Sequence, residues 1–112
     1  MAIYNKNDEK LEAICKKLNA VKLEEWHNEE QHFYTQQEGL KFCLSGYYDE
    51  ENGASEVSLH ILDAETEKVI KEYDDVSKMY KKFEGLVKRD MKQKIAKTKK
   101  RAKKLLDDFV YS

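Results

Sequence analysis

The sequence predicts an α+β protein with a short N-terminal helix, an antiparallel sheet of three to four strands and a long basic C-terminal helix. Two changes of period lead to this order. Apolar residues recur every three or four positions near the N-terminus, every second position between residues 21 and 74, and every three or four positions again from residue 76 onward. The outer two patterns are typical of helices, and the middle one is typical of strands that bury one face.

One apolar stripe predicts the N-terminal helix. It consists of Leu11, Ile14, Cys15 and Leu18. The spacing i, i+3, i+4, i+7 places all four residues on one helix face. Asn7 or Asp8 is the expected N-cap, because its side chain can accept a hydrogen bond from a free N–H of the first turn. Asn19 is the expected C-cap.

The strand candidates follow in the middle of the chain. They cover residues 21–27, 31–37, 40–48, 56–62 and 69–74. A turn is expected at residues 28–30, but 21–37 can also be counted as one irregular element, so we expect three to four regular antiparallel strands. Segment 31–37 is the most polar, which predicts a position at the sheet edge. Asn52-Gly53 predicts a hairpin, because both residue types tolerate positive φ.

The C-terminal helix is predicted from a stripe that runs from Val76 to Phe109, with Asp74 or Asp75 as its N-cap. A helix over 76–110 would be about 52 Å long, whereas a seven-residue strand spans only about 23 Å. One small sheet cannot cover such a helix. It therefore either breaks near 97–100 or projects its second half, and a projecting half with an apolar seam would need a partner.

Charge divides what we expect to be a single domain of 112 residues. Residues 1–77 contain 8 basic and 18 acidic side chains, a net charge of −10. Residues 78–104 contain 13 basic and 2 acidic side chains, a net charge of +11. The prediction is therefore an acidic helix-plus-sheet part, 1–77, followed by a long basic helix, 78–112.

Three interpretations of the basic helix remain open. Its lysines can be the solvated back of an amphipathic helix, because lysine is a good helix former. They can neutralise the phosphates of a nucleic acid, with sheet aromatics as stacking platforms. They can flank a seam, Met91 to Phe109, that pairs with an acidic protein or a second copy. Nucleic acid is the weaker choice, because arginine is scarce in the run and the isoelectric point is only about 6.3.

No enzyme activity, cofactor or metal is expected. The chain contains no G-x-S-x-G, P-loop or G-x-G-x-x-G motif. His27, His32 and His60 lack the spacing of metal ligands. Cys15 and Cys43 are expected to be free core thiols of a protein in a reducing compartment. Because neither a signal peptide nor an apolar run of roughly 18 residues is found, the expected location is the cytoplasm, away from membranes.

These observations together predict a small non-enzymatic protein-binding module, a regulator or inhibitor. Its proline-free, lysine-rich composition is common in proteins of A/T-rich bacterial genomes and their phages, which suggests a phage or mobile-element origin. The expected partner is a protein or a second copy of the chain. The alternative is a nucleic-acid-binding protein that uses the basic helix and aromatic residues of the sheet.

The candidate partner-binding residues fall into two groups. The first lies on the basic helix and consists of Lys92, Lys94, Lys97, Lys99, Lys100, Arg101, Lys103 and Lys104. The second lies at the expected hairpin and consists of Tyr47, Tyr48, Asp49, Glu50 and Glu51. Paired tyrosines beside three acids form an amphipathic contact surface of the kind interfaces favour. The simpler alternative is that one tyrosine packs on the core and the other lies on the surface.

Overall fold

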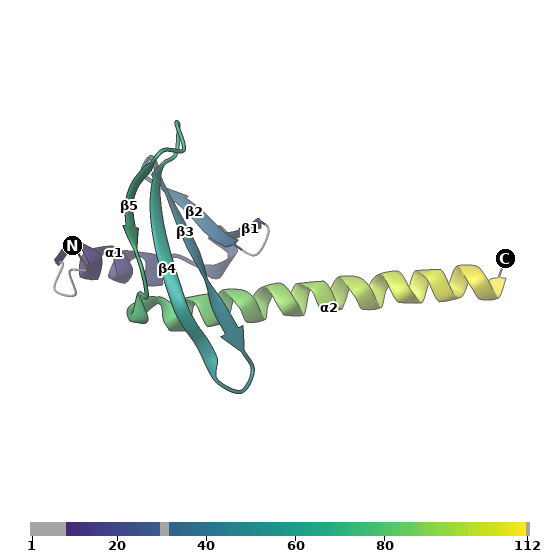
Figure 1. The fold of residues 1–112 in the computed structure, drawn as a ribbon. Coiled ribbons are helices and arrows are strands. Elements are labelled where there is room, and N and C mark those ends of the chain that lie inside the picture. The colour runs from purple at the N-terminus through teal and green to yellow at the C-terminus, as the bar shows by residue number, and fades with distance from the viewer. Residues whose placement is uncertain (1–8, 30–31, 112) are drawn as a thin grey trace.

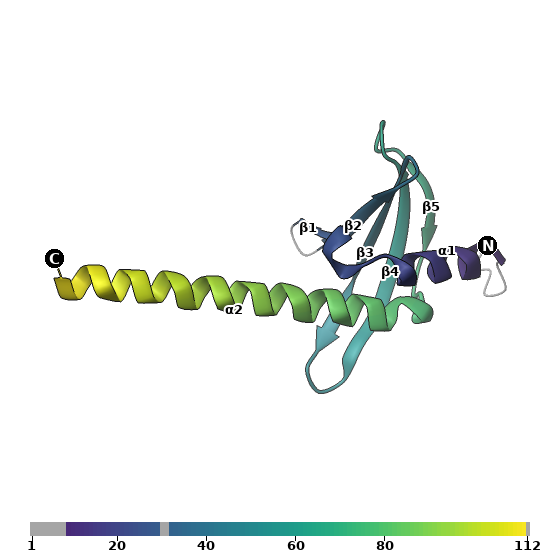
Figure 2. The same cartoon turned by 180° about the vertical axis from the view of Figure 1, so that it is seen from behind.

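The computed structural model describes residues 9–29 and 32–111 and has two α-helices on one face of a five-stranded antiparallel sheet (Figures 1 and 2). The α-helices are α1 (Glu9–Ala20) and α2 (Tyr80–Tyr111). The strands are β1 (His27–Glu29), β2 (His32–Gln37), β3 (Leu40–Asp49), β4 (Gly53–Asp63) and β5 (Val69–Tyr73). They pair in the order of the sequence, β1-β2-β3-β4-β5. The predicted α+β class with an antiparallel sheet is thus confirmed, and the predicted number of strands, three to four, is too small.

The first strand candidate, 21–27, is wrong over most of its length. The structure has a 3-10 turn, η1 (Leu23–Glu25), and β1 begins only at His27. The turn expected at 28–30 is also wrong for Asn28 and Glu29, which belong to β1; residue 30 lies outside the described residues. Alternation over six residues therefore did not make a strand here.

Strand β2 is not at the edge of the sheet, although it was predicted there. It pairs with β1 on one side and β3 on the other. Phe33 and Thr35 are buried, and the Thr35 hydroxyl donates a hydrogen bond to the Glu25 carbonyl oxygen, 3.0 Å away. The sequence of β2 is polar because every second residue of the strand lies on the sheet face opposite the helices, which is open.

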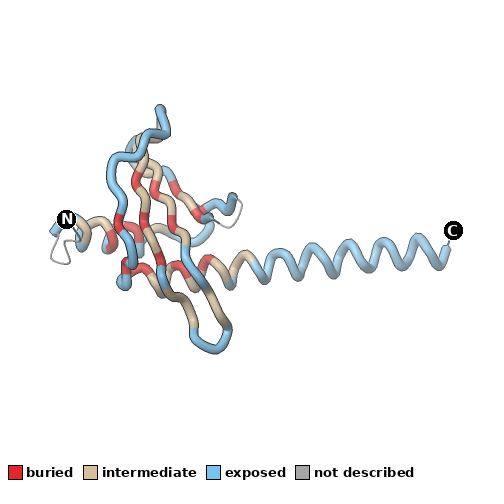
Figure 3. Tube along the Cα trace, viewed as in Figure 1, coloured by how far each residue is buried: buried red, intermediate tan, exposed pale blue. Residues whose placement is uncertain are grey.

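The core lies between the helices and the sheet (Figure 3). It contains Cys15, Leu18, Trp26, Phe33, Phe42, Leu44, Val57, Leu59, Ile61, Tyr73, Val76, Met79, Phe83 and Leu86. The predicted stripe of α1 is confirmed, with Cys15 and Leu18 buried and Leu11 and Ile14 packed beside them. The alternating apolar positions of β3 and β4 also face this core.

The predicted C-cap of α1 and the predicted N-cap of the C-terminal helix are wrong. Asn19 lies inside α1, and its side-chain amide donates to the Lys78 carbonyl oxygen at 3.2 Å instead of ending the helix. Before α2 comes a 3-10 turn, η2 (Ser77–Met79), whose N-cap is Val76 and not Asp74 or Asp75. Asn7 and Asp8 lie outside the described residues.

Helix α2 is continuous and leaves the body, which is the second of the two alternatives considered for it. It runs from Tyr80 to Tyr111 with no break near 97–100. The radius of gyration is 17.7 Å and the longest dimension 64 Å, whereas a compact chain of this length would have a radius of about 13 Å. Figure 1 shows why: the C-terminal half of α2 extends far beyond the sheet.

Candidate partner-binding surface

The N-terminal turns of α2, residues 80–90, are anchored to the body. Phe83 and Leu86 are buried in the core. On a neighbouring part of the same helix, Arg89 Nη1 donates to the Leu23 carbonyl oxygen at 3.2 Å. The Lys82 ammonium similarly donates to the Val21 carbonyl oxygen. The segment between α1 and β1 therefore holds the helix by its backbone carbonyls as well as by apolar packing.

Asp90 marks the end of the anchored part. Its Oδ2 lies 3.0 Å from Lys94 Nζ, and its carboxylate also accepts a hydrogen bond from Asn28 of β1. Partial burial raises the pKa of Asp90, but the hydrogen bonds from Lys94 and Asn28 outweigh burial and leave this pKa below its ordinary value. The ionised carboxylate thus links the edge strand to the point where α2 leaves the sheet.

Beyond Asp90 the helix is exposed throughout. Every residue from Met91 to Tyr111 is in the exposed class, over a length of about 31 Å (Figure 3). We call this stretch the projecting half. It contains one row that is apolar except at Thr98; this row, the seam, is formed by Met91, Ile95, Thr98, Ala102, Leu105 and Phe109. Leu106 and Val110 widen the apolar surface near its C-terminal end.

The seam is strongly exposed for an apolar surface. The exposed fractions are 53% for Ile95, 57% for Leu105 and 62% for Leu106. Scattered apolar residues are ordinary on protein surfaces, but exposed apolar residues aligned on one helix face are characteristic of interaction sites. The seam also continues the line along which Phe83 and Val87 pack on the body, so a partner would extend the existing core.

All eight basic candidates lie on the projecting half. Four flank the seam: Lys92, Lys94, Lys99 and Arg101. The other four lie on the side or back of the helix: Lys97, Lys100, Lys103 and Lys104. With Asp107 and Asp108, residues 91–111 have eight basic and two acidic side chains, a net charge of +6. The rest of the chain has thirteen basic and twenty acidic side chains, a net charge of −7.

The hairpin group lies elsewhere. The β3–β4 hairpin crosses α2 where the helix leaves the sheet, and α2 continues well beyond it (Figure 2). A Cβ added to Gly53 would lie 3.7 Å from the Glu84 carboxylate, which places the hairpin beside the anchored turns. The structure therefore does not bring residues 47–51 together with the C-terminal end of the basic group.

The side chains of the hairpin have unequal roles. Tyr48 packs against the core, whereas Tyr47 is exposed. The Asp49 carboxylate is occupied within the turn, where it accepts from the Glu51 N–H at 2.9 Å and the Asn52 side-chain amide at 3.1 Å. The simpler interpretation of the tyrosine pair thus describes this hairpin, and Tyr47, Glu50 and Glu51 remain as exposed candidates.

The open face of the sheet gathers the polar side chains that sequence analysis considered for chemistry. One row crosses all five strands and consists of His27, Tyr34, Cys43, His60 and Glu72. Cys43 was expected in the core, but it lies half-buried on this opposite face because Phe42 and Leu44 face inward. Burial raises the pKa of its thiol, although Lys41 opposes the shift. Among residues 9–29 and 32–111, no group of three His, Cys, Asp or Glu side chains is placed to hold a metal ion.

Several aromatic residues at or near the sheet are covered. Trp26, Phe33 and Phe42 are buried. Tyr34 lies on the open face, but Lys41 Nζ lies over its ring, 4.4 Å from the centroid, and His27 packs beside it. Nucleic-acid bases could therefore stack on only some of the aromatic side chains that the sequence suggested.

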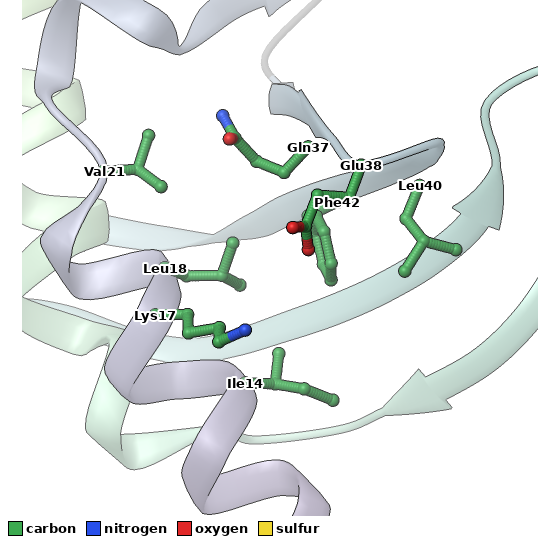
Figure 4. Close-up of a pocket in the computed structure, with 8 residues that line it drawn as sticks. All are labelled: Ile14, Lys17, Leu18, Val21, Gln37, Glu38, Leu40 and Phe42. Carbon is green, nitrogen blue, oxygen red and sulfur yellow. The ribbon is translucent and has the colours of Figure 1, made fainter.

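A shallow pocket of about 280 Å³ lies between α1 and the β2–β3 turn (Figure 4). It is lined by Ile14, Lys17, Leu18, Val21, Gln37, Glu38, Leu40 and Phe42. Leu18 and Phe42 belong to the buried core, and the other apolar side chains of the lining pack against it. Its volume is just below the range of about 300–1,000 Å³ typical of small-molecule sites, and we assign it no ligand.

Sequence analysis missed the contact between η1 and α2 that orients the projecting half. Gly85 was given no role, yet a Cβ at this position would lie 3.6 Å from Leu23 Cδ2. The signal for the contact was weak. It consisted of one glycine and one arginine, Arg89, at helical spacing on a face otherwise rich in lysine.

Within the described ranges, no helix has both the length and the apolar character needed to cross a membrane. Comparison with protein-family models, with curated proteins and with solved structures found no match to this chain.

Proposed function

We propose that this protein is a small non-enzymatic protein-binding module whose binding surface is the projecting half of α2. The observation that carries the proposal is the seam, an apolar row on a helix that is exposed at every residue from 91 to 111. In proteins most of the stability of a helix comes from packing of its apolar face, and the projecting half lacks such packing. Its apolar row becomes useful when a second surface covers it, as in helix-in-groove recognition or helix pairing.

The anchored turns support such a role. Residues 80–90 supply formed helical turns on which the projecting half can propagate without a new nucleation step. The hydrogen bonds from Lys82 and Arg89 hold the direction of the helix relative to the sheet. A helix that is ordered before binding loses less conformational entropy on association, which favours affinity.

A module of this kind needs no reactive group of its own. It would act as a regulator or inhibitor by occupying a surface on its partner. The hairpin residues Tyr47, Glu50 and Glu51 form a second, smaller exposed surface on the same molecule. They are not required for the proposal. A partner large enough to reach from the projecting half past the anchored turns would contact them as well.

Retention of a partner from a lysate of the producing cells tests the proposal. The test variant is Ile95→Glu with Leu105→Glu, which places two charges in the seam. The matched control is Gln93→Glu with Ala96→Glu, which makes the same change of net charge on the back of the helix. We expect the wild type and the control to retain the same protein and the seam variant to lose it. Retention by the folded seam variant would contradict the proposal.

Nucleic-acid binding is the second candidate, and one observation favours it. Lys97, Lys100, Lys103 and Lys104 are exposed away from the seam, where helix pairing does not need them. Phosphate neutralisation would give an affinity that falls steeply with salt. Nuclease treatment of half of the lysate separates the candidates, because a nucleic-acid ligand is lost on treatment. A panel of DNA and RNA at about 50 mM salt checks the same point directly.

A further inference from the structure

We infer that the seam pairs with an acidic amphipathic helix of a different protein, in a short coiled coil along residues 91–109. The inference rests on the proposed function and names the partner's chemistry. Its first support is the spacing. The seam residues follow one another in steps of four, three, four, three and four. This is the heptad pattern that keeps an apolar row facing a second helix, whereas a helix that lies in a broad groove uses a wider face.

The second support is the charge beside the seam. In a coiled coil the positions next to the apolar row face the corresponding positions of the partner and select it by charge. Here they are occupied by Lys92, Lys94, Lys99 and Arg101, and then by Leu106 and Asp108. Four of the six are basic and one is acidic. A partner with Glu or Asp at its flanking positions would gain complementary contacts along the first two heptads.

A second copy of the chain fits this surface poorly. A parallel pair would place Lys94 opposite Lys99 of the second copy. An antiparallel pair with Met91 opposite Phe109 would place Lys99 opposite Lys99 and Arg101 opposite Arg101. Lys94 would meet Asp108 at each end of that pair, but the centre would remain repulsive. Like charges across an interface are a common means of rejecting the wrong partner.

The middle of the seam also disfavours a second copy. Thr98 and Ala102 are the smallest seam residues. In the antiparallel pair they would face each other and leave the central layers underfilled, which costs stability as a cavity does. A different helix can place leucine opposite both residues. The small centre and the basic flanks therefore indicate the same occupant, an acidic helix with large apolar residues.

Three synthetic peptides of about three heptads test the inference against the full-length protein. The acidic peptide has Leu and Ile on its apolar row and Glu at the flanking positions. The basic peptide has the same row with Lys at those positions. The scrambled acidic peptide has the composition of the first, with its apolar residues distributed around the helix. Binding is measured by fluorescence anisotropy of the labelled peptide, and self-association is measured by sedimentation of the protein alone.

We expect the acidic peptide to bind at least about tenfold more tightly than the basic and the scrambled peptides, because only it offers both complementary flanks and a row. The Ile95→Glu, Leu105→Glu variant should lose this binding, and the Gln93→Glu, Ala96→Glu control should retain it. Reversing the flanks with Lys92→Glu, Lys94→Glu, Lys99→Glu and Arg101→Glu should transfer the preference to the basic peptide. Fluorescence of Trp26, the only tryptophan, verifies that each variant is folded.

Three results would overturn the inference. The first is equal binding, or no binding, of the acidic and basic peptides. The second is seam-dependent dimerisation of the protein alone, which would assign the seam to a second copy. The third is binding of duplex DNA that the flank reversal abolishes and the seam variant leaves intact. The proposed function is tested separately, because it fails if the folded seam variant retains the cellular partner.

Discussion

Arg89 Nη1 donates a hydrogen bond to the backbone carbonyl oxygen of Leu23, 3.2 Å away, and joins the last anchored turns of α2 to the segment between α1 and β1. The two residues are 66 positions apart in the chain. Their contact lies just before Asp90, at the point where the helix leaves the sheet. The body thereby holds the projecting half of α2 in a defined direction, and the two parts of one helix acquire different roles.

Truncating apolar side chains in the two parts of α2 should therefore change the stability of the protein by very different amounts. Leu86 is 2% exposed in the core, so Leu86→Ala should lower the free energy of unfolding by about 2–5 kcal/mol. Ile95→Ala in the exposed seam should change it by no more than about 0.5 kcal/mol. Urea unfolding followed by Trp26 fluorescence measures both. A large loss for Ile95→Ala would mean that the projecting half packs on the body in solution.

Two glycines should respond to alanine with opposite signs. A Cβ on Gly46, in β3, would lie 3.0 Å from both Cα and Cγ2 of Val57, so Gly46→Ala should lower the free energy of unfolding by about 1–3 kcal/mol. Gly85 lies in the interior of α2 with only ordinary contacts around its Cβ position. Gly85→Ala should therefore raise stability by about 0.5–1 kcal/mol through helix propensity. The same unfolding assay checks the pair, and destabilisation by Gly85→Ala would contradict the packing of η1 on α2.

The two thiols should react at different rates. Cys15 is 1% exposed, whereas Cys43 is half-buried on the open face of the sheet. Burial raises the pKa of each thiol, so both are neutral at pH 7 and their reaction should accelerate towards pH 9 as thiolate forms. A chromogenic thiol reagent should modify Cys43 first and Cys15 only on unfolding. In the Cys43→Ser variant only the slow reaction of Cys15 should remain. A fast reaction in this variant would contradict the burial of Cys15.

Stability should fall in acid partly through Asp63. Its carboxylate accepts backbone N–H bonds from Thr66 and Glu65, which hold the pKa of Asp63 below its ordinary value. The unfolded chain binds the proton more readily, so this contribution is present above the ordinary carboxyl pKa of about 4 and is lost as pH falls through the folded-state pKa. Urea unfolding at pH 6 and at lower pH should show a shallower acid loss for Asp63→Asn than for the Glu65→Gln control. Equal pH profiles for the two variants would show that the turn does not depend on the charge of Asp63.

Much of this fold could be predicted from the sequence because its patterns are local. The stripe of α1 and the alternation in β3 and β4 follow directly from which side chains face the core. The length of the apolar stripe left two alternatives, a break near 97–100 or a projecting second half, because no sheet of seven-residue strands could cover the helix; the structure has the second. The seam and its basic flanks could also be identified in this way.

The errors occur where long-range contacts decide local structure. Residues 21–26 alternate like a strand, but Leu23 packs near Gly85 of α2 and Trp26 is buried, and these contacts favour the 3-10 turn η1. Strand β2 appeared to be an edge strand because its outward residues are polar, and nothing local reveals that β1 pairs beyond it. Cys43 was misplaced for the same reason, since a half-buried open face can hold a cysteine.

If the proposed function is correct, partner binding covers the projecting half of α2. Hydrogen exchange of the full-length protein, free and with the partner it retains, measures this directly for each backbone segment. Amides of residues 91–111 should exchange readily in the free protein and gain protection in the complex, while those of the core strands change little. Protection gained at the β3–β4 hairpin or on the open face of the sheet, with residues 91–111 unchanged, would contradict the proposed function.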